Sequence, residues 1–167
     1  KEAALRDDLK SRLGRAGADV ARIELLPPAH LPSEHLATYG RIDVALDTFP
    51  YNGTTTTCEA LWMGRPVVTL AGEFHMSRVG ATLLRSAGLQ DLVASSAQDY
   101  VKIAVDLARD RSLRTSLSAA MRQRLGGSPL LDHAGYTRRL ERALEATASH
   151  GLTGVHDAGA DLATFRR

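Results

Sequence analysis

The residues best suited to chemistry lie in the segment DTFPYNGTTTTCEALWMG, residues 47–64. An Asn-Gly pair, which favours a tight turn, precedes four consecutive threonines, Thr54 to Thr57. Threonine is β-branched and favours strands, yet the residues that follow have the spacing of a short helix. Gly64 is placed to end that helix as its C′ residue. We therefore predict a turn followed by a helix that runs from about Thr56 to Met63.

The start of this helix is predicted to hold a phosphate or a pyrophosphate. The first amides of a helix lack intrahelical acceptors and carry the positive end of the helix dipole. The hydroxyls of Thr54, Thr55 and Thr56 add hydrogen-bond donors at the same point. Glu59 follows one turn later, where a carboxylate suits the two hydroxyls of a ribose better than it suits a phosphate. The pattern indicates a nucleotide, although the segment has neither a Walker A motif nor a GxGxxG motif.

An ordinary capping box explains part of the same pattern. In that structure Thr56 caps the helix and Glu59, three residues later, reaches back to the backbone. Capping is commoner than phosphate binding, so the pattern alone favours it. Capping needs only one of the four threonines, and both interpretations stay open at this point.

Other polar residues are weaker candidates. His35 could stack on a base or donate to a phosphate, and Arg78 could contact an anion or be a surface charge. The six histidines show no metal-ligand spacing, so no metal site is predicted. Cys58 and Trp62 are predicted to pack in the core.

The loop that carries the threonines requires a parallel sheet to position it. Segments 41–49 and 65–72 contain uninterrupted apolar runs, which are typical of strands covered on both faces. The predicted order is β-α-β-α-β-α followed by helices, which is an α/β fold. Ligands bind beyond the carboxyl ends of the strands in such folds. The elements expected in this half are strands 21–28, 41–49 and 65–72, and helices 1–13, 32–40 with Ser33 as N-cap, 56–63 and 73–88.

The second half is predicted to be helical. Ser96 and Asp99 have the spacing of a capping box, and Asp110 begins another helix. A last helix follows the break GGSP, residues 126–129, with Tyr136, Leu140, Leu144 and Thr147 predicted to face inward.

Composition bounds the class of protein. The 167 residues are enough for one domain, and the net charge of +2 gives no reason to expect a nucleic-acid or membrane partner. Apolar runs are short, there is no signal peptide, and a single cysteine excludes an internal disulfide framework. We therefore predict a soluble, cytoplasmic unit. Because the chain begins with a helix that has no cap, we expect a fragment whose N-terminal remainder is missing.

Two long segments carry a family resemblance. DVALDTFPYNGTTTTCEALWMGRPVVTLAGEFHMSRVG, followed by SPLLDHAGYTRRLE, resembles the C-terminal catalytic lobe of the O-linked N-acetylglucosamine transferases, and above all their bacterial relatives with tetratricopeptide repeats. The resemblance covers roughly residues 20–148. It implies the C-terminal half of a GT-B glycosyltransferase, a Rossmann-like parallel-sheet lobe with extra C-terminal helices. Residues 1–149 would form the nucleotide-sugar-binding lobe. Residues 150–167 have weak periodicity and many small side chains, which predicts a mobile tail.

The resemblance also implies roles for residues. Thr54, Thr55 and Thr56 lie where the family binds the UDP diphosphate, Glu59 replaces an aspartate that binds the ribose, and His35 contacts the nucleotide. The implied reaction transfers N-acetylglucosamine from UDP-GlcNAc, with inversion, to Ser or Thr hydroxyls of a protein or peptide acceptor, without a cofactor or metal. The family's catalytic histidines belong upstream of residue 1, so no catalytic residue is predicted in this fragment and it should be inactive by itself.

Departures from the family pattern leave alternatives open. The animal enzymes have a histidine in place of Thr54, and a lysine and an arginine in the segment that spans Pro32 and Thr38. The alternatives are a degenerate nucleotide-binding or interaction module, the same fold with another donor such as GDP-fucose, and a GT-B sugar-nucleotide epimerase.

Overall fold

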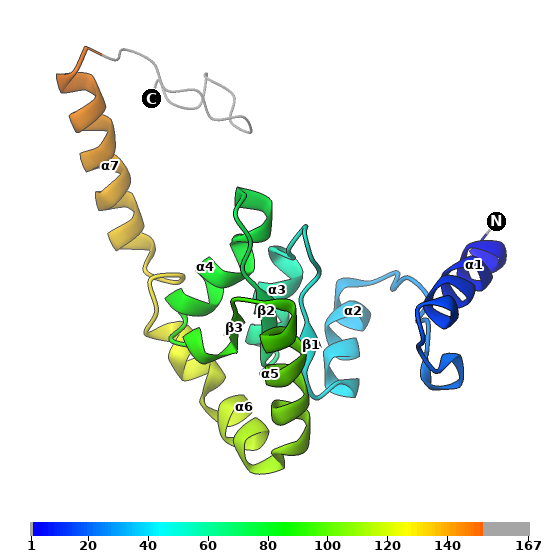
Figure 1. Cartoon of the computed structure of the whole chain (residues 1–167). Helices are drawn as coiled ribbons and strands as arrows, with labels where there is room; N and C mark the ends of the chain where they lie inside the picture. Colours follow the sequence, from blue (N-terminus) through cyan, green and yellow to red (C-terminus); the bar gives the residue numbers. More distant parts are fainter. Residues whose placement is uncertain (1, 152–167) are drawn as a thin grey trace. The chain divides into compact units, whose positions relative to one another are not determined.

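The computed structural model describes residues 2–151 and divides the chain into two compact units, Lys1–Thr38 and Tyr39–Arg167 (Figure 1). The predicted tail, apart from His150 and Gly151, lies outside the described residues. Every helix between residues 2 and 151 is too short or too polar to cross a lipid bilayer.

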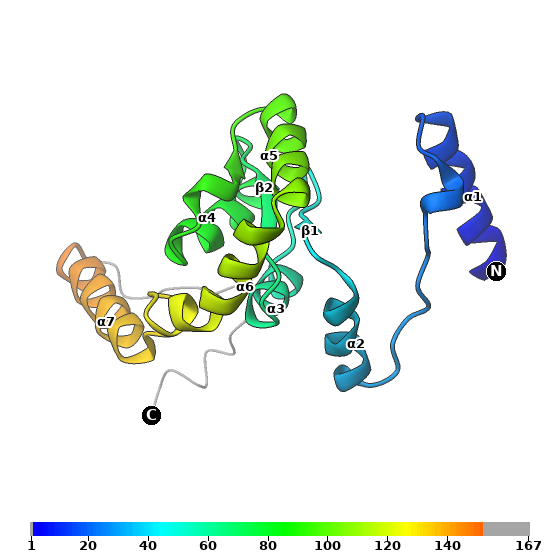
Figure 2. The ribbon, with the colours of Figure 1, turned by 90° about the horizontal axis from the view of Figure 1, so that it is seen from below.

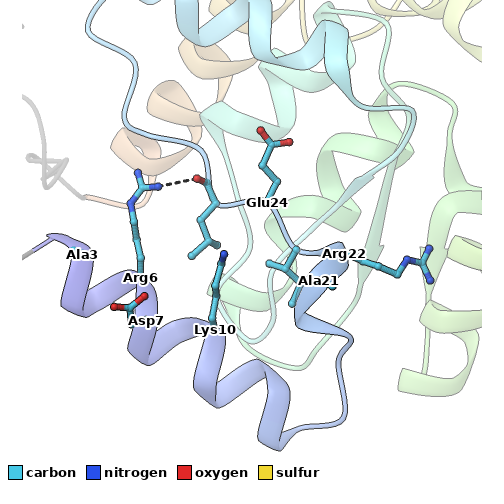
Figure 3. A pocket seen from close by; sticks show the side chains of 9 residues that line it. Ala3, Arg6, Asp7, Lys10, Ala21, Arg22 and Glu24 are labelled. Atoms are coloured by element: carbon cyan, nitrogen blue, oxygen red, sulfur yellow. Dashed lines mark hydrogen bonds between the residues drawn. The ribbon is translucent and has the colours of Figure 1, made fainter.

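The first unit is helical. It contains α1 (Glu2–Arg15), the 3₁₀ turn η1 (Val20–Arg22) and α2 (Pro32–Thr38). Arg6 Nη1 donates a hydrogen bond to the Leu25 carbonyl over 2.8 Å, beside a cavity of about 440 Å³ between α1 and residues 21–25 (Figure 3). The predicted first helix is therefore confirmed.

Two predictions in this unit are wrong. The segment 21–28 is not a strand: it begins in η1, and no residue from 2 to 38 forms a β-ladder. A strand needs a neighbouring edge for its backbone groups, and an apolar run does not create one. Ser33 is not an N-cap, since Pro32 already occupies the first helical position. The Glu34 carboxylate instead accepts the amides of His30 and Leu31, at 3.1 and 3.3 Å.

The second unit is built on a three-stranded parallel sheet. Its strands are β1 (Ala45–Leu46), β2 (Val67–Leu70) and β3 (Val93–Ala94), in the order β1-β2-β3. Ala45 pairs with Val67, and Thr69 pairs with Val93. The predicted strands 41–49 and 65–72 are confirmed in position, although both are shorter. The third strand is β3, which the sequence analysis missed because its apolar run, residues 92–94, is too short to be recognised as a strand.

Helices cover this sheet. Helices α3, α4 and α5 all pack against β2, and α6 packs against α3 and α5 (Figures 1 and 2). The helices and turns of this unit are η2 (Tyr39–Arg41), α3 (Thr55–Trp62), η3 (His75–Ser77), α4 (Val79–Ser86), η4 (Gln90–Leu92), α5 (Ala97–Arg109), α6 (Arg111–Gly126) and α7 (His133–Ser149). The largest fully buried apolar side chains of the core include Leu61, Val67, Val68, Leu84, Leu107 and Met121.

The predicted helix ends mostly hold. Ser96 Oγ accepts the Asp99 amide at 3.1 Å, and Asp110 Oδ1 accepts the Leu113 amide at 2.8 Å. The Asp99 carboxylate accepts a hydrogen bond from the Ser95 hydroxyl at 2.9 Å. The predicted capping box instead had this carboxylate bonded to the backbone amide of Ser96. Gly64 follows α3 with a φ of 73°, which confirms its C′ role.

One predicted helix start in this unit and several predictions of burial are wrong. Helix α4 begins at Val79 because residues 73–78 form a loop with η3. Tyr136 and Leu140 on α7 are 63% and 40% exposed, because the described chain does not cover that face. Cys58 is exposed, and Trp62 is 46% exposed with the Arg122 guanidinium 5.2 Å from the centre of its ring.

Candidate functional site

A buried carboxylate fixes the loop that follows β1. The Asp47 amide donates to the Val68 carbonyl at 2.9 Å and so continues the β-pairing. Asp47 Oδ1 accepts the Gly53 amide and Oδ2 accepts the Thr69 hydroxyl, both at 2.7 Å. The Asp47 carbonyl accepts the Tyr100 hydroxyl at 2.8 Å. Because both carboxylate oxygens accept hydrogen bonds, these bonds offset part of the desolvation cost of Asp47, which joins the threonine loop to the sheet.

Asn52 joins the same loop to its neighbour. Its side chain is 2% exposed, and its backbone amide donates to the Met76 carbonyl at 2.8 Å. Its side-chain amide donates to the Thr48 carbonyl at 2.8 Å, and its Oδ1 accepts the Gly80 amide at 3.3 Å. A Cβ atom on Gly80 would overlap the Asp47 carboxylate and the Thr69 hydroxyl. The loops after β1 and β2 therefore form one fixed assembly.

The four threonines have different surroundings. Thr54 precedes α3, makes no side-chain capping bond, and is followed by Thr55 as the first helical residue. Thr57 is buried, and its hydroxyl donates to the Gly53 carbonyl at 3.1 Å. Thr54, Thr55 and Thr56 are exposed, and their hydroxyls bond to no residue that the structure describes. The fold thus uses only the fourth threonine and leaves three hydroxyls at the start of α3.

The capping-box interpretation of this segment is wrong. Thr56 lies inside α3 rather than before it, so it cannot be the N-cap. Glu59 Oε2 accepts the Tyr39 hydroxyl at 3.1 Å, and that hydroxyl also lies 3.2 Å from the Thr56 carbonyl. Burial, and then the hydrogen bond and charge of Glu59, raise the pKa of Tyr39 to about 12. The phenol therefore remains a neutral donor that orients the Glu59 carboxylate.

A small cavity lies under the start of α3. It has a volume of about 130 Å³ and is bounded by Tyr39, Asp47, Gly53, Thr56 and Thr57, among others. The helix begins at Thr55, so the amides of its first turn have no acceptor within the helix. Amides, hydroxyls and one oriented carboxylate thus meet at the carboxyl end of β1, where α/β proteins bind ligands.

Arg78 lies next to this assembly. It directly precedes α4, is exposed, and its Nη1 donates to the Gly72 carbonyl at 2.8 Å. A guanidinium has five N–H donors, so this bond leaves others for an anion.

The structure brings most of the predicted site residues together. Thr54, Thr55, Thr56 and Glu59 lie along the first turn and a half of α3, and Arg78 belongs to the adjoining loop. His35 lies exposed on α2 in the first unit, so its contact with a nucleotide stays a prediction. Among residues 2–151 no group of three or more His, Cys, Asp and Glu is placed to hold a metal.

Sequence reasoning missed the residues that support the site. Asp47 and Asn52 stand in the quoted segment, but their partners Thr69 and Gly80 are 22 and 28 residues away. Tyr39 is 20 residues from Glu59. The one available signal was that DTFPYNG starts with an acid at the end of a predicted strand.

Comparison with known proteins decides the family. Residues 8–140 match glycosyl transferase family 41. The chain belongs to this family. Among curated relatives, the probable UDP-N-acetylglucosamine–peptide N-acetylglucosaminyltransferases SPINDLY of Oryza sativa and Arabidopsis thaliana are 44% and 40% identical over 140 residues. The alignment covers 84% of this chain and 15% of each relative.

Two further relatives of this family 41 chain come from other organisms. The UDP-N-acetylglucosamine–peptide N-acetylglucosaminyltransferase of Caenorhabditis elegans is 36% identical over 128 residues, which cover 77% of this chain and 11% of that protein. The solved structure of an O-GlcNAc transferase mutant from Thermobaculum terrenum superposes with a TM-score of 0.73 at 45% identity. The superposition covers 81% of this chain and 26% of the solved chain.

These matches confirm the predicted transferase family and the α/β, GT-B lobe. This family 41 chain spans about a seventh of the length of the curated plant relatives. Its bacterial type, tetratricopeptide repeats and cytoplasmic location stay predictions.

Proposed function

We propose that this chain is the UDP-binding lobe of an inverting protein O-glycosyltransferase. The longer protein would transfer N-acetylglucosamine from UDP-GlcNAc to Ser or Thr hydroxyls of a protein acceptor. One observation carries the proposal: three hydroxyls that the fold does not use stand at the start of α3, one turn from an oriented carboxylate. The names of the family 41 relatives supply the donor and the acceptor class.

The proposed binding mode follows from charge and donor type. The diphosphate would lie at the start of α3, where the amides and the hydroxyls of Thr54, Thr55 and Thr56 donate to it. These donors would stabilise the negative charge that grows on UDP as it leaves. Arg78 would offer a further contact to the anion from the adjoining loop.

Glu59 would bind the ribose. Its carboxylate accepts hydrogen bonds and would repel a phosphate, so it suits the sugar hydroxyls of the nucleotide. Tyr39 orients it through the 3.1 Å hydrogen bond. His35 would contact the nucleotide. The proposal assigns no catalytic residue to this chain and requires no cofactor or metal; the groups that act on the acceptor would belong to the longer protein.

Calorimetric titration with UDP tests the proposal in a protein completed with the part that precedes residue 1 in its relatives. Thr55→Ala with Glu59→Ala should weaken UDP binding, because each lost charge-assisted contact is worth about 1.5–3 kcal/mol. The double change Thr137→Ala with Glu141→Ala removes an exposed pair of the same types and spacing on α7, and it should leave binding unchanged. Equal loss of melting temperature and of affinity in the first variant would contradict a ligand-binding role. So would a completed protein that prefers phosphate to UDP.

One observation favours a different sugar donor. The helix that carries His35 has the sequence PSEHLAT, without the lysine and arginine that the animal enzymes have there. The same lobe with GDP-fucose as donor fits this difference, and titration with UDP and GDP in parallel separates the two donors. If neither nucleotide binds and the completed protein glycosylates no peptide, the chain is a degenerate interaction module instead.

A further inference from the structure

A basic cavity lies on the second unit, away from the nucleotide loop. Its volume is about 590 Å³. Asp43 precedes β1 and Arg65 precedes β2, so the cavity lies at the amino-terminal edge of a parallel sheet. The nucleotide loop follows the carboxyl end of β1, at the opposite edge. The residues that line the cavity are Asp43, Arg65, Arg111, Arg114, Thr115, Ser118 and Ala119.

The arginines of this cavity are not equally engaged. Arg114 Nη1 donates to the Leu107 carbonyl at 2.9 Å and also contacts the Ala108 carbonyl. Arg114 Nε lies 3.9 Å from the carboxylate of Asp43, the one acid in the lining. Arg114 therefore stabilises the fold, and its charge neutralises that of Asp43, which would otherwise repel an anion.

Arg65 and Arg111 have no such partners. Neither guanidinium forms a hydrogen bond or an ion pair with any residue from 2 to 151, and Arg65 Nε is buried without an acceptor. A buried N–H group without an acceptor is costly, and native proteins rarely leave one. Three guanidinium groups against one carboxylate leave two positive charges in the cavity.

We propose that this cavity binds a phosphate group, either as inorganic phosphate or as the phosphoryl group of a larger ligand. A guanidinium matches the oxygens of a phosphate with two parallel N–H donors. The phosphate dianion balances the two positive charges. Thr115 and Ser118 also line the cavity, but the Thr115 hydroxyl already donates to the Arg111 carbonyl at 2.9 Å, so the guanidinium groups are the donors on which the site depends. Arg65 and Arg111 hold the anion, whereas Arg114 holds Asp43. This site is independent of the proposed nucleotide site.

The test follows the Nε–Hε signals of the arginines in the ¹⁵N-labelled chain by NMR. Inorganic phosphate and, separately, glycerol phosphate are titrated above pH 7, with sodium chloride keeping the ionic strength constant. The Arg65 and Arg111 signals should shift and reach a plateau. Arg111→Gln should weaken the affinity read from Arg65 about tenfold, which corresponds to one lost charge-assisted hydrogen bond. Tighter binding of glycerol phosphate than of inorganic phosphate would identify the larger ligand as the source.

Arg85→Gln is the matched control, because Arg85 is exposed on α4, is absent from the cavity lining and carries the same charge. It should leave the phosphate affinity unchanged. Arg111 is exposed as well, so Arg111→Gln should keep the melting temperature of the parent chain. Three results would overturn the proposal: no shift of the Arg65 signal beyond that in sodium chloride, equal effects of the two variants, or acetate binding as tightly as phosphate.

Discussion

In the run Thr54–Thr57, four identical side chains have different roles because of where the helix begins. The Thr57 hydroxyl donates to the Gly53 carbonyl, whereas the three preceding threonines are exposed. Glu59, one turn later, is oriented by the Tyr39 phenol. Residues that look alike in the sequence thus separate into one that supports the fold and three that are available to a ligand.

Tyr39 allows a prediction about pH. Unfolded tyrosine has a pKa of about 10, and in the folded chain the pKa of Tyr39 is raised to about 12. The neutral phenol therefore contributes its full stability below about pH 10, and that contribution disappears as the pH rises through about 12. Urea unfolding at several alkaline pH values should show this loss in the parent chain and a smaller loss in Tyr39→Phe.

Tyr136→Phe is the control for this measurement, since it removes an exposed phenol from α7. It should lose stability with pH as the parent chain does. Burial and the charge of Asp47 also raise the pKa of Tyr100, but Tyr100 is present in every variant. Identical pH profiles for Tyr39→Phe and Tyr136→Phe would show that the bond between Tyr39 and Glu59 does not stabilise the fold.

At the scale of the elements, sequence patterns predicted what is local. Helix α3 starts one residue before its predicted start, and α5 and α6 begin at the predicted caps Ser96 and Asp110. What failed depends on distant partners: segment 21–28 lacks a neighbouring strand, and β3 is recognisable only by its pairing with β2. The sequence did not predict the residues that support the candidate site for the same reason, since Asp47, Asn52 and Gly80 meet only after folding.

Gly80 on α4 lies directly against the side chains of Asp47 and Thr69. In Gly80→Ala the new methyl group would overlap the Asp47 carboxylate and the Thr69 hydroxyl, which join the threonine loop to the sheet. Overpacking of this kind typically costs about 1–3 kcal/mol. We expect this loss in the free energy of unfolding, measured by denaturant titration, together with weaker UDP binding because the start of α3 is displaced.

Gly126→Ala is the matched change at the end of α6, where a Cβ atom would meet nothing within 4 Å. Alanine favours a helix over glycine by roughly 0.5–1 kcal/mol, so this variant should be as stable as the parent or slightly more. If Gly80→Ala were as stable as Gly126→Ala, the two loops would accommodate the added methyl group without a loss in the free energy of unfolding, which would contradict the prediction.

At the scale of the molecule, the two units contribute differently. Every buried apolar side chain among the described residues belongs to the second unit, from Ala60 to Leu125. The first unit contains only exposed and partly exposed side chains where the structure describes them, and it carries His35. Stability should therefore depend on residues 39–151, while the proposed nucleotide contact of His35 would come from the first unit.

Removal of residues 1–38 separates these two contributions. Residues 39–167 keep the whole described core, so their unfolding midpoint should stay close to that of the parent chain. UDP affinity should fall to the level of the full chain with His35→Ala, because both changes remove the same imidazole. His30→Ala, at an exposed histidine just before α2, should bind UDP as the parent chain does. A large drop in the midpoint of residues 39–167 would show that the first unit supplies packing. UDP affinity unchanged by both His35→Ala and the removal would refute the assignment of His35 as a residue that stabilises bound UDP.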